Sequence, residues 1–120
     1  MRIVVDLDGV ICSIKRPGQP YADVEPLPGA ADRIRELRAA GHTIVIVTAR
    51  HMATCEGNVG RVIQRVGKIT LDWLERHGIE YDEIHFGKPN GEVYLEDRAI
   101  RFTGWDQLTD EVLKREARPR

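Results

Sequence analysis

The stretch 2–9, R-I-V-V-D-L-D-G, constrains the fold more than any other part of the chain. Its apolar, β-branched run has no polar face, which is typical of a strand buried on both faces of a parallel sheet. Side chains alternate along a strand, so Asp6 and Asp8 project in one direction while Leu7 points into the core. Two neighbouring carboxylates repel each other, and a divalent cation, a shared proton or a basic neighbour relieves the repulsion. The simpler alternative is an acidic turn, because Asp and Gly are common in turns.

A second strand end follows one helix later. Residues 43–47, T-I-V-I-V, predict another buried strand, and the apolar stripe over 29–40 predicts the helix before it. A right-handed strand–helix–strand unit places Thr48 at the same sheet edge as Asp6. A hydroxyl, loop amides and the guanidinium of Arg50 suit the oxygens of a phosphate. Arg50 is equally compatible with an exposed ion pair.

The rest of the chain alternates between irregular and periodic stretches. The proline-rich segment 10–28 is expected to be a loop, and residues 10–25 are candidates for substrate contact because loops at the carboxyl ends of strands line ligand sites. Trp73 is expected in the core. The periodicity predicts a helix over 61–77, short strands over 84–86, 93–95 and 100–102, and a closing helix over 105–115.

Composition excludes several classes of function. With 120 residues, 42% of them hydrophobic and 31% charged, the chain fits one globular domain, and a net charge of −1 gives no basic field for nucleic acid. No apolar stretch approaches the roughly 18 residues of a membrane span, and there is no signal-peptide pattern, so we expect no membrane and a cytoplasmic location. Cys12 and Cys55 are then expected to be free thiols without zinc.

The polar residues at the strand ends occur in a distinctive order: Asp6 with Asp8, then Thr48, Lys88, and Glu96 with Asp97. This order resembles the four motifs of the haloacid dehalogenase superfamily of phosphohydrolases. The resemblance implies a doubly wound, Rossmann-like three-layer sandwich with a mainly parallel sheet. Cap domains in this superfamily follow the first motif or the second, and neither gap is long enough here. We therefore expect residues 1–120 to form a single capless domain.

The resemblance implies a role for each motif. Asp6 would attack phosphorus and form an aspartyl-phosphate, and Asp8 would act as general acid and then general base. Thr48 would bind the phosphoryl oxygens, and Lys88 would balance the negative charge. Lys68 is a rival for that cation, although it falls inside an expected helix.

A magnesium ion is part of the same resemblance. Mg²⁺ would be held by Asp6, the backbone carbonyl of Asp8, and Asp97. The second acidic motif is often Asp-Asp, whereas this chain has Glu96 before Asp97, and Glu96 is expected to contact the metal or one of its ligands. Asp8 is absent from the superfamily's dehalogenases, so its presence implies phosphate esters as substrates.

Four short motifs refine the resemblance: T-A-R-H-M, E-G-N-V-G, G-K-P-N-G and L-E-D-R-A-I. They are similar to a small capless group associated with capsule and surface polysaccharide biosynthesis, which implies a small phosphorylated substrate such as a sugar phosphate. An open, capless site can be covered by another subunit, so we expect a homo-oligomer. The residues expected to contact substrate, each with a structural role as the alternative, are Gly9, Ala49, Arg50, His51, Asn58 and Arg98.

Two other classes of protein remain as alternatives. The receiver domain of response regulators also combines Mg²⁺, an aspartyl-phosphate, a Thr and a Lys. In that family the acidic pair ends the first strand and the phosphorylated Asp ends the third, whereas here the acids follow the first and fourth expected strands. The second alternative is a catalytically inactive phosphate-binding module.

Overall fold

Three parallel strands form the sheet, in the spatial order β1-β2-β3. A computed structural model describes residues 1–119 of the chain. Arg2 is paired with Thr43, and Val45 with Glu83, across the two ladders. The elements in chain order are β1 Arg2–Asp6, the 3₁₀ turn η1 Tyr21–Asp23, α1 Ala30–Ala39, β2 Thr43–Thr48, α2 Val59–Arg76, β3 Glu83–Phe86, the 3₁₀ turn η2 Trp105–Gln107 and α3 Asp110–Glu116.

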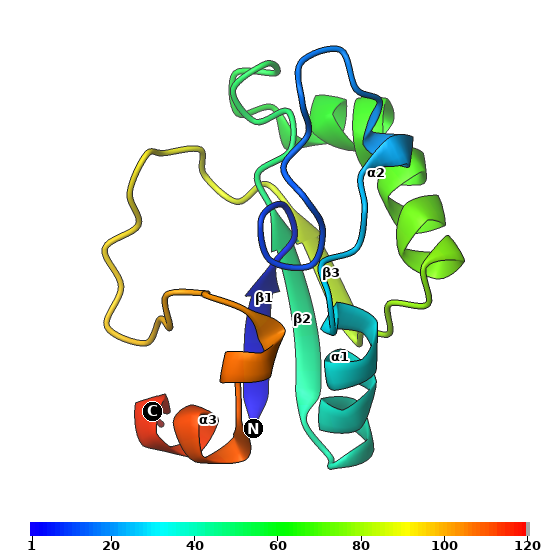
Figure 1. The fold of residues 1–120 in the computed structure, drawn as a ribbon. Coiled ribbons are helices and arrows are strands. Elements are labelled where there is room, and N and C mark those ends of the chain that lie inside the picture. Colours follow the sequence, from blue (N-terminus) through cyan, green and yellow to red (C-terminus); the bar gives the residue numbers. More distant parts are fainter. Residues whose placement is uncertain (120) are drawn as a thin grey trace.

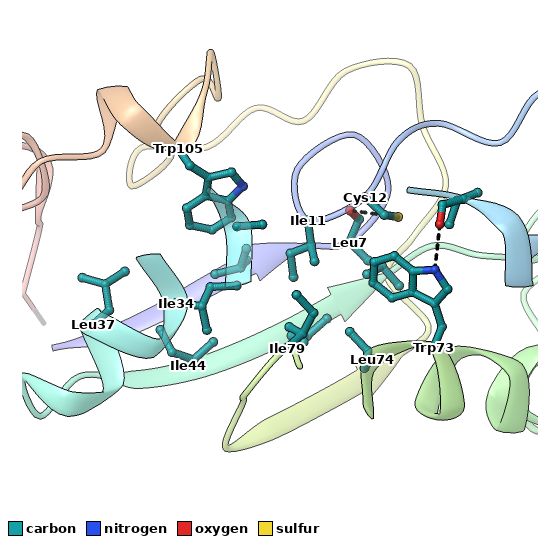
Figure 2. Packing of buried hydrophobic residues seen from close by; sticks show 14 of the residues in the cluster. Leu7, Ile11, Cys12, Ile34, Leu37, Ile44, Trp73, Leu74, Ile79 and Trp105 are labelled. Atoms are coloured by element: carbon teal, nitrogen blue, oxygen red, sulfur yellow. Dashed lines mark hydrogen bonds between the residues drawn. The ribbon is translucent and has the colours of Figure 1, made fainter. Parts of the chain in front are cut away.

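Helices α1 and α2 cover one face of this sheet (Figure 1). Right-handed connections between parallel strands that advance in one direction place successive helices on the same side. Ile34 of α1 and the expected core residue Trp73 of α2 are fully buried with Ile44 of β2. The Trp73 indole N–H donates a hydrogen bond to the Val24 carbonyl at 2.8 Å (Figure 2). On the opposite face of β1, Val4 is 57% exposed.

The expected closing helix is divided in two. Trp105 belongs to η2, and α3 begins only after Thr109, whose hydroxyl accepts a hydrogen bond from the Val112 amide at 3.3 Å. The non-helical backbone of Leu108 separates the two elements. Trp105 is buried, and its indole N–H donates to the Val10 carbonyl at 2.7 Å. The end of the chain is thereby joined to the loop after β1.

The strands expected over 93–95 and 100–102 are not formed, so those two predictions are wrong. Every residue from Pro89 to Arg101 is exposed, and this segment, here named the arm (89–101), makes a wide arc away from the sheet (Figure 1). The local preference of V-Y-L for extended structure is not sufficient, because a strand is stabilised by its cross-strand neighbours.

The α/β fold class is confirmed: within residues 1–119 the chain has an open, parallel three-stranded sheet and helices in a Rossmann-like arrangement. None of the helices within residues 1–119 is long and apolar enough to cross a membrane.

Candidate active site

Three of the expected site residues meet at the carboxyl ends of the strands. Asp6 ends β1 and Thr48 ends β2, while Lys88 follows β3 by two residues. The Lys88 amide donates to the Thr48 carbonyl at 3.1 Å, and Lys88 Nζ lies 3.4 Å from Asp6 Oδ2. The other Asp6 oxygen, Oδ1, accepts a hydrogen bond from the Leu7 amide at 2.8 Å. A carboxylate held between an amide and an ammonium group therefore lies at the end of the first strand.

The chain turns tightly after β1 around one carbonyl oxygen. The Leu7 carbonyl accepts hydrogen bonds from the amides of Ile11 at 2.9 Å and Cys12 at 3.1 Å. Gly9 has a φ of 87°, a conformation that side chains disfavour, and its amide donates to the Cys12 carbonyl at 2.8 Å. This turn places the Asp8 carboxyl group beside the start of the loop that follows β2.

Arg50 holds that carboxyl group from the inside of the protein. Its Nε lies 3.0 Å from Asp8 Oδ2, and its Nη2 lies 3.0 Å from Asp8 Oδ1. Its Nη1 donates to the Thr70 hydroxyl at 3.0 Å, and the Tyr21 ring stacks on the guanidinium at 4.2 Å. The Arg50 side chain has no exposed surface. For Arg50 the sequence predicted a substrate contact or a surface ion pair. The one signal of this buried cluster in the sequence was the polar residue Thr70 within the apolar stripe of α2.

Cys12 lies in the same cluster. Its Sγ is 3.3 Å from Asp8 Oδ1 and 3.5 Å from Arg50 Nη2. Burial, and next the charge of Asp8, raises the pKa of the Cys12 thiol to about 12. The thiol is therefore protonated at neutral pH and is not a nucleophile. Both cysteines are free and buried.

His51 lies at the outer side of this cluster. Its backbone has a φ of 59°, and its ring is 5.8 Å from that of Tyr21. Its buried Nδ1 has no hydrogen-bond partner among residues 1–119. Burial lowers the pKa of His51, and the charges of Arg65, Lys15 and Arg50 lower it further. Lys15, Arg50 and Arg65 thus place positive charge near His51, and Asp8 balances the charge of Arg50.

The remaining expected contacts have structural partners. Asn58 caps α2, because its Oδ1 accepts a hydrogen bond from the Arg61 amide at 3.1 Å. The buried Thr48 hydroxyl accepts one from the Arg50 amide at 3.1 Å, and Ala49 is half-buried between these two residues. Lys68, the rival of Lys88, lies exposed on α2 and pairs with Asp72 at 2.6 Å.

The expected magnesium ligands do not all converge. Glu96 and Asp97 lie on the exposed arm, and so does Arg98. No three carboxylate, imidazole or thiol side chains within residues 1–119 are grouped so that they could hold a metal ion. The carboxylates of a single chain therefore do not fit a complete Mg²⁺ site, which needs several oxygen ligands in one octahedral shell.

Comparisons with known proteins add a close relative and a distant one. No family model matches the sequence, and no curated protein matches it. A crystal structure of a structural-genomics target from Vibrio cholerae is 36% identical, with a TM-score of 0.85 over 96% of this chain and 94% of that one. The D,D-heptose 1,7-bisphosphate phosphatase from B. bronchiseptica, crystallised with magnesium and phosphate, is 21% identical, with a TM-score of 0.50. That match covers 76% of this chain and 51% of the phosphatase, and at this identity it shows the fold alone.

Proposed function

Because the chain belongs to the same family as the Vibrio cholerae protein and has a haloacid dehalogenase-like fold, we propose that it is a phosphatase acting on small phosphate monoesters. The observation that carries the proposal is the Asp6 carboxylate at the end of β1, 3.4 Å from the Lys88 ammonium. An oriented carboxylate with an adjacent cation is what nucleophilic attack on a phosphoryl group requires.

The reaction proceeds in two displacements. An Asp6 oxygen attacks phosphorus and the bond from phosphorus to the ester oxygen breaks, while Asp8, a carboxylate beside Arg50 at rest, passes a proton of the monoanionic ester to the leaving oxygen. A water molecule then attacks the aspartyl-phosphate while Asp8 takes one of its protons, the bond from phosphorus to Asp6 breaks, and Asp8 returns the proton to the departing phosphate. Lys88 stabilises the negative charge in both steps.

Arg50 acts on this reaction through Asp8. Two of its nitrogens hold the two Asp8 oxygens, and Thr70 and Tyr21 fix the guanidinium in turn. The Asp8 carboxyl group is thereby kept in one orientation before substrate binds, which lowers the cost of reaching a reactive geometry. Arg50 is a positioning residue in this scheme.

The proposal includes Mg²⁺, with Asp6 and the Asp8 carbonyl as the ligands at the end of β1. Asp97 and Glu96 lie on the exposed arm of the same chain and would complete the site only if they were brought to it. Magnesium bound next to Asp6 would neutralise charge on the phosphoryl group. The magnesium and phosphate found with the structurally similar heptose bisphosphate phosphatase support this part of the proposal.

The substrate we propose is a sugar phosphate. The positive charges of Lys15 and Arg65 near His51 favour an anionic ligand.

The test is release of phosphate by the purified full chain with Mg²⁺ from a panel of sugar phosphates and an aryl phosphate. We expect hydrolysis, with a phosphorylated aspartate at Asp6 detectable by mass spectrometry after rapid acid quenching. Asp6→Asn should abolish both signals, whereas the control Asp72→Asn, on the surface of α2, should keep them. Lack of hydrolysis across the panel would refute the phosphatase proposal, and full activity of Asp6→Asn would refute the nucleophile.

A further inference from the structure

The sheet ends at β1 with an unpaired edge. β1 is hydrogen-bonded to β2 on one side, and no segment within residues 1–119 forms a ladder on its other side. Val4, in the middle of β1, is 57% exposed. An edge of this kind, with free backbone groups and an apolar side chain, is the usual template for adding a strand.

Tyr94 alternates with two more exposed neighbours on the arm. The Tyr94 hydroxyl donates to the Pro89 carbonyl at 2.5 Å, and Lys88 Nζ lies 4.1 Å from the centre of the Tyr94 ring. Tyr94 is 49% exposed, whereas Val93 before it is 73% exposed and Leu95 after it is 97% exposed. This alternation places two large apolar side chains on one face, where they contact water instead of protein.

The arm cannot easily supply a parallel strand to its own β1. Lys88 is fixed at the carboxyl end of the sheet by its contacts with Thr48 and Asp6, and only residues 89–92 separate it from Val93. A parallel strand in the same sheet needs a crossover of about a dozen residues or more. The arm instead leaves the arrowhead end of the sheet and descends, opposite to the direction of β1 (Figure 1). On this path the arm, which carries Glu96 and Asp97, runs away from the arrowhead end of β1 (Figure 1).

We propose that the arm of one copy of this chain pairs with the free edge of β1 in a second copy, and that the exchange is reciprocal. Residues 93–96 of one copy can run parallel to β1 of the partner, because no crossover within a single sheet is then needed. Val93 or Leu95 then covers the face that exposes Val4. A two-fold arrangement of this kind uses the same pair of surfaces twice, so the arm and the β1 edge of each copy are both occupied.

The exchange also completes the metal site. A strand parallel to the partner's β1 delivers Glu96 and Asp97 at the carboxyl end, where the partner has Asp6 and Asp8. The carboxylates that do not converge in one chain would then meet between two chains. This metal part rests on the proposed phosphatase function, whereas the pairing of the arm with β1 does not.

The pairing is tested first by mass in solution and by cross-linking. The full chain should sediment at twice the 13.6 kDa of one copy. Leu95→Asp should be a monomer, and the control Ile69→Asp, which changes an exposed apolar residue on α2, should remain a dimer. A monomeric native protein, or a Leu95→Asp dimer as stable as the control, would overturn the proposal.

Cross-linking then locates the arm. A Val4→Cys variant mixed with a Leu95→Cys variant and treated with a short bis-maleimide should give a covalent dimer joined through positions 4 and 95. The native cysteines are buried and do not compete. A mixture of Leu95→Cys with Ile69→Cys should give no such product. If the Val4→Cys/Leu95→Cys double variant is instead cross-linked as a monomer, the arm lies on its own β1 and the exchange is wrong.

The metal part is tested with Mn²⁺ alone, by electron paramagnetic resonance. The Asp6→Asn and Asp97→Asn variants should each bind Mn²⁺ weakly. When subunits of the two variants are exchanged, about half of the dimers are mixed, and each mixed dimer has one intact site. Tight binding should therefore return at about a quarter of all sites. No recovery on mixing would overturn shared sites. Recovery without phosphate release by the native dimer would support the exchange and refute the proposed phosphatase function.

Discussion

Replacing Arg50 by Met removes a buried charge while keeping the length of the side chain. In the native protein the Arg50 side chain has no exposed surface, and the Asp8 side chain paired with it is 25% exposed. Breaking a buried ion pair by removing one partner costs about 3–5 kcal/mol, because the other charge stays behind without compensation. Since water can reach Asp8, we expect the lower end, about 3 kcal/mol of unfolding free energy, or roughly 10 °C in Tm for a domain of this size.

The assay is urea unfolding followed by circular dichroism. The control is Arg35→Met, which removes a surface ion pair with Asp32 on α1 and should cost less than about 1 kcal/mol. Asp8→Asn added to Arg50→Met should restore part of the loss, because the unpaired carboxylate is then removed, with a coupling of about 1–3 kcal/mol. A loss below about 1 kcal/mol in Arg50→Met, or strict additivity in the double variant, would refute the buried pair as the element that holds the loop after β1.

Three further outcomes are expected. The His51 pKa lies below its usual value of about 6.5, so its contribution to stability is present above that pH and is lost as pH falls from about 6.5 to the folded pKa. An NMR titration should show the lowered midpoint of His51, and added phosphate should raise that midpoint. The Cys12 pKa of about 12 means that iodoacetamide labels it at pH 8 only in urea, and that stability falls as pH rises above about 8.5. Gly87→Ala should lose about 1–3 kcal/mol more than Gly78→Ala in urea unfolding, since both have positive φ but only at Gly87 would a Cβ lie 2.8 Å from Val59; equal losses would contradict that contact.

The strands and helices that the sequence predicted well are those with local signals. β2 and α1 differ from the expected ranges by a single residue at some ends, because periodicity and a terminal glycine define them. The meeting of Asp6, Thr48 and Lys88 followed from topology alone, since parallel strands end at the same edge. These features required no knowledge of distant contacts.

The features that were missed depend on contacts between distant segments. Arg50 reads as a polar residue in a loop, and only the fold brings Asp8 and Thr70 to its two ends. Val93 and Leu95 have the propensity of a strand, but propensity does not provide a neighbouring strand to pair with. Glu96 and Asp97 were expected at the end of the strand over 93–95. Because that strand is not formed, the two residues lie elsewhere than expected.

The hydrogen bond from the Trp105 indole to the Val10 carbonyl has a consequence for the order of synthesis. It joins residues 95 positions apart, and through Val10 it fixes the turn that carries Asp8. A nascent chain can form β1, α1 and β2 early, since their contacts lie within the first half of the sequence. The turn after β1 gains this support only when the last part of the chain has been made, so the polypeptide should form its first two strands and their helix before the candidate site is rigid.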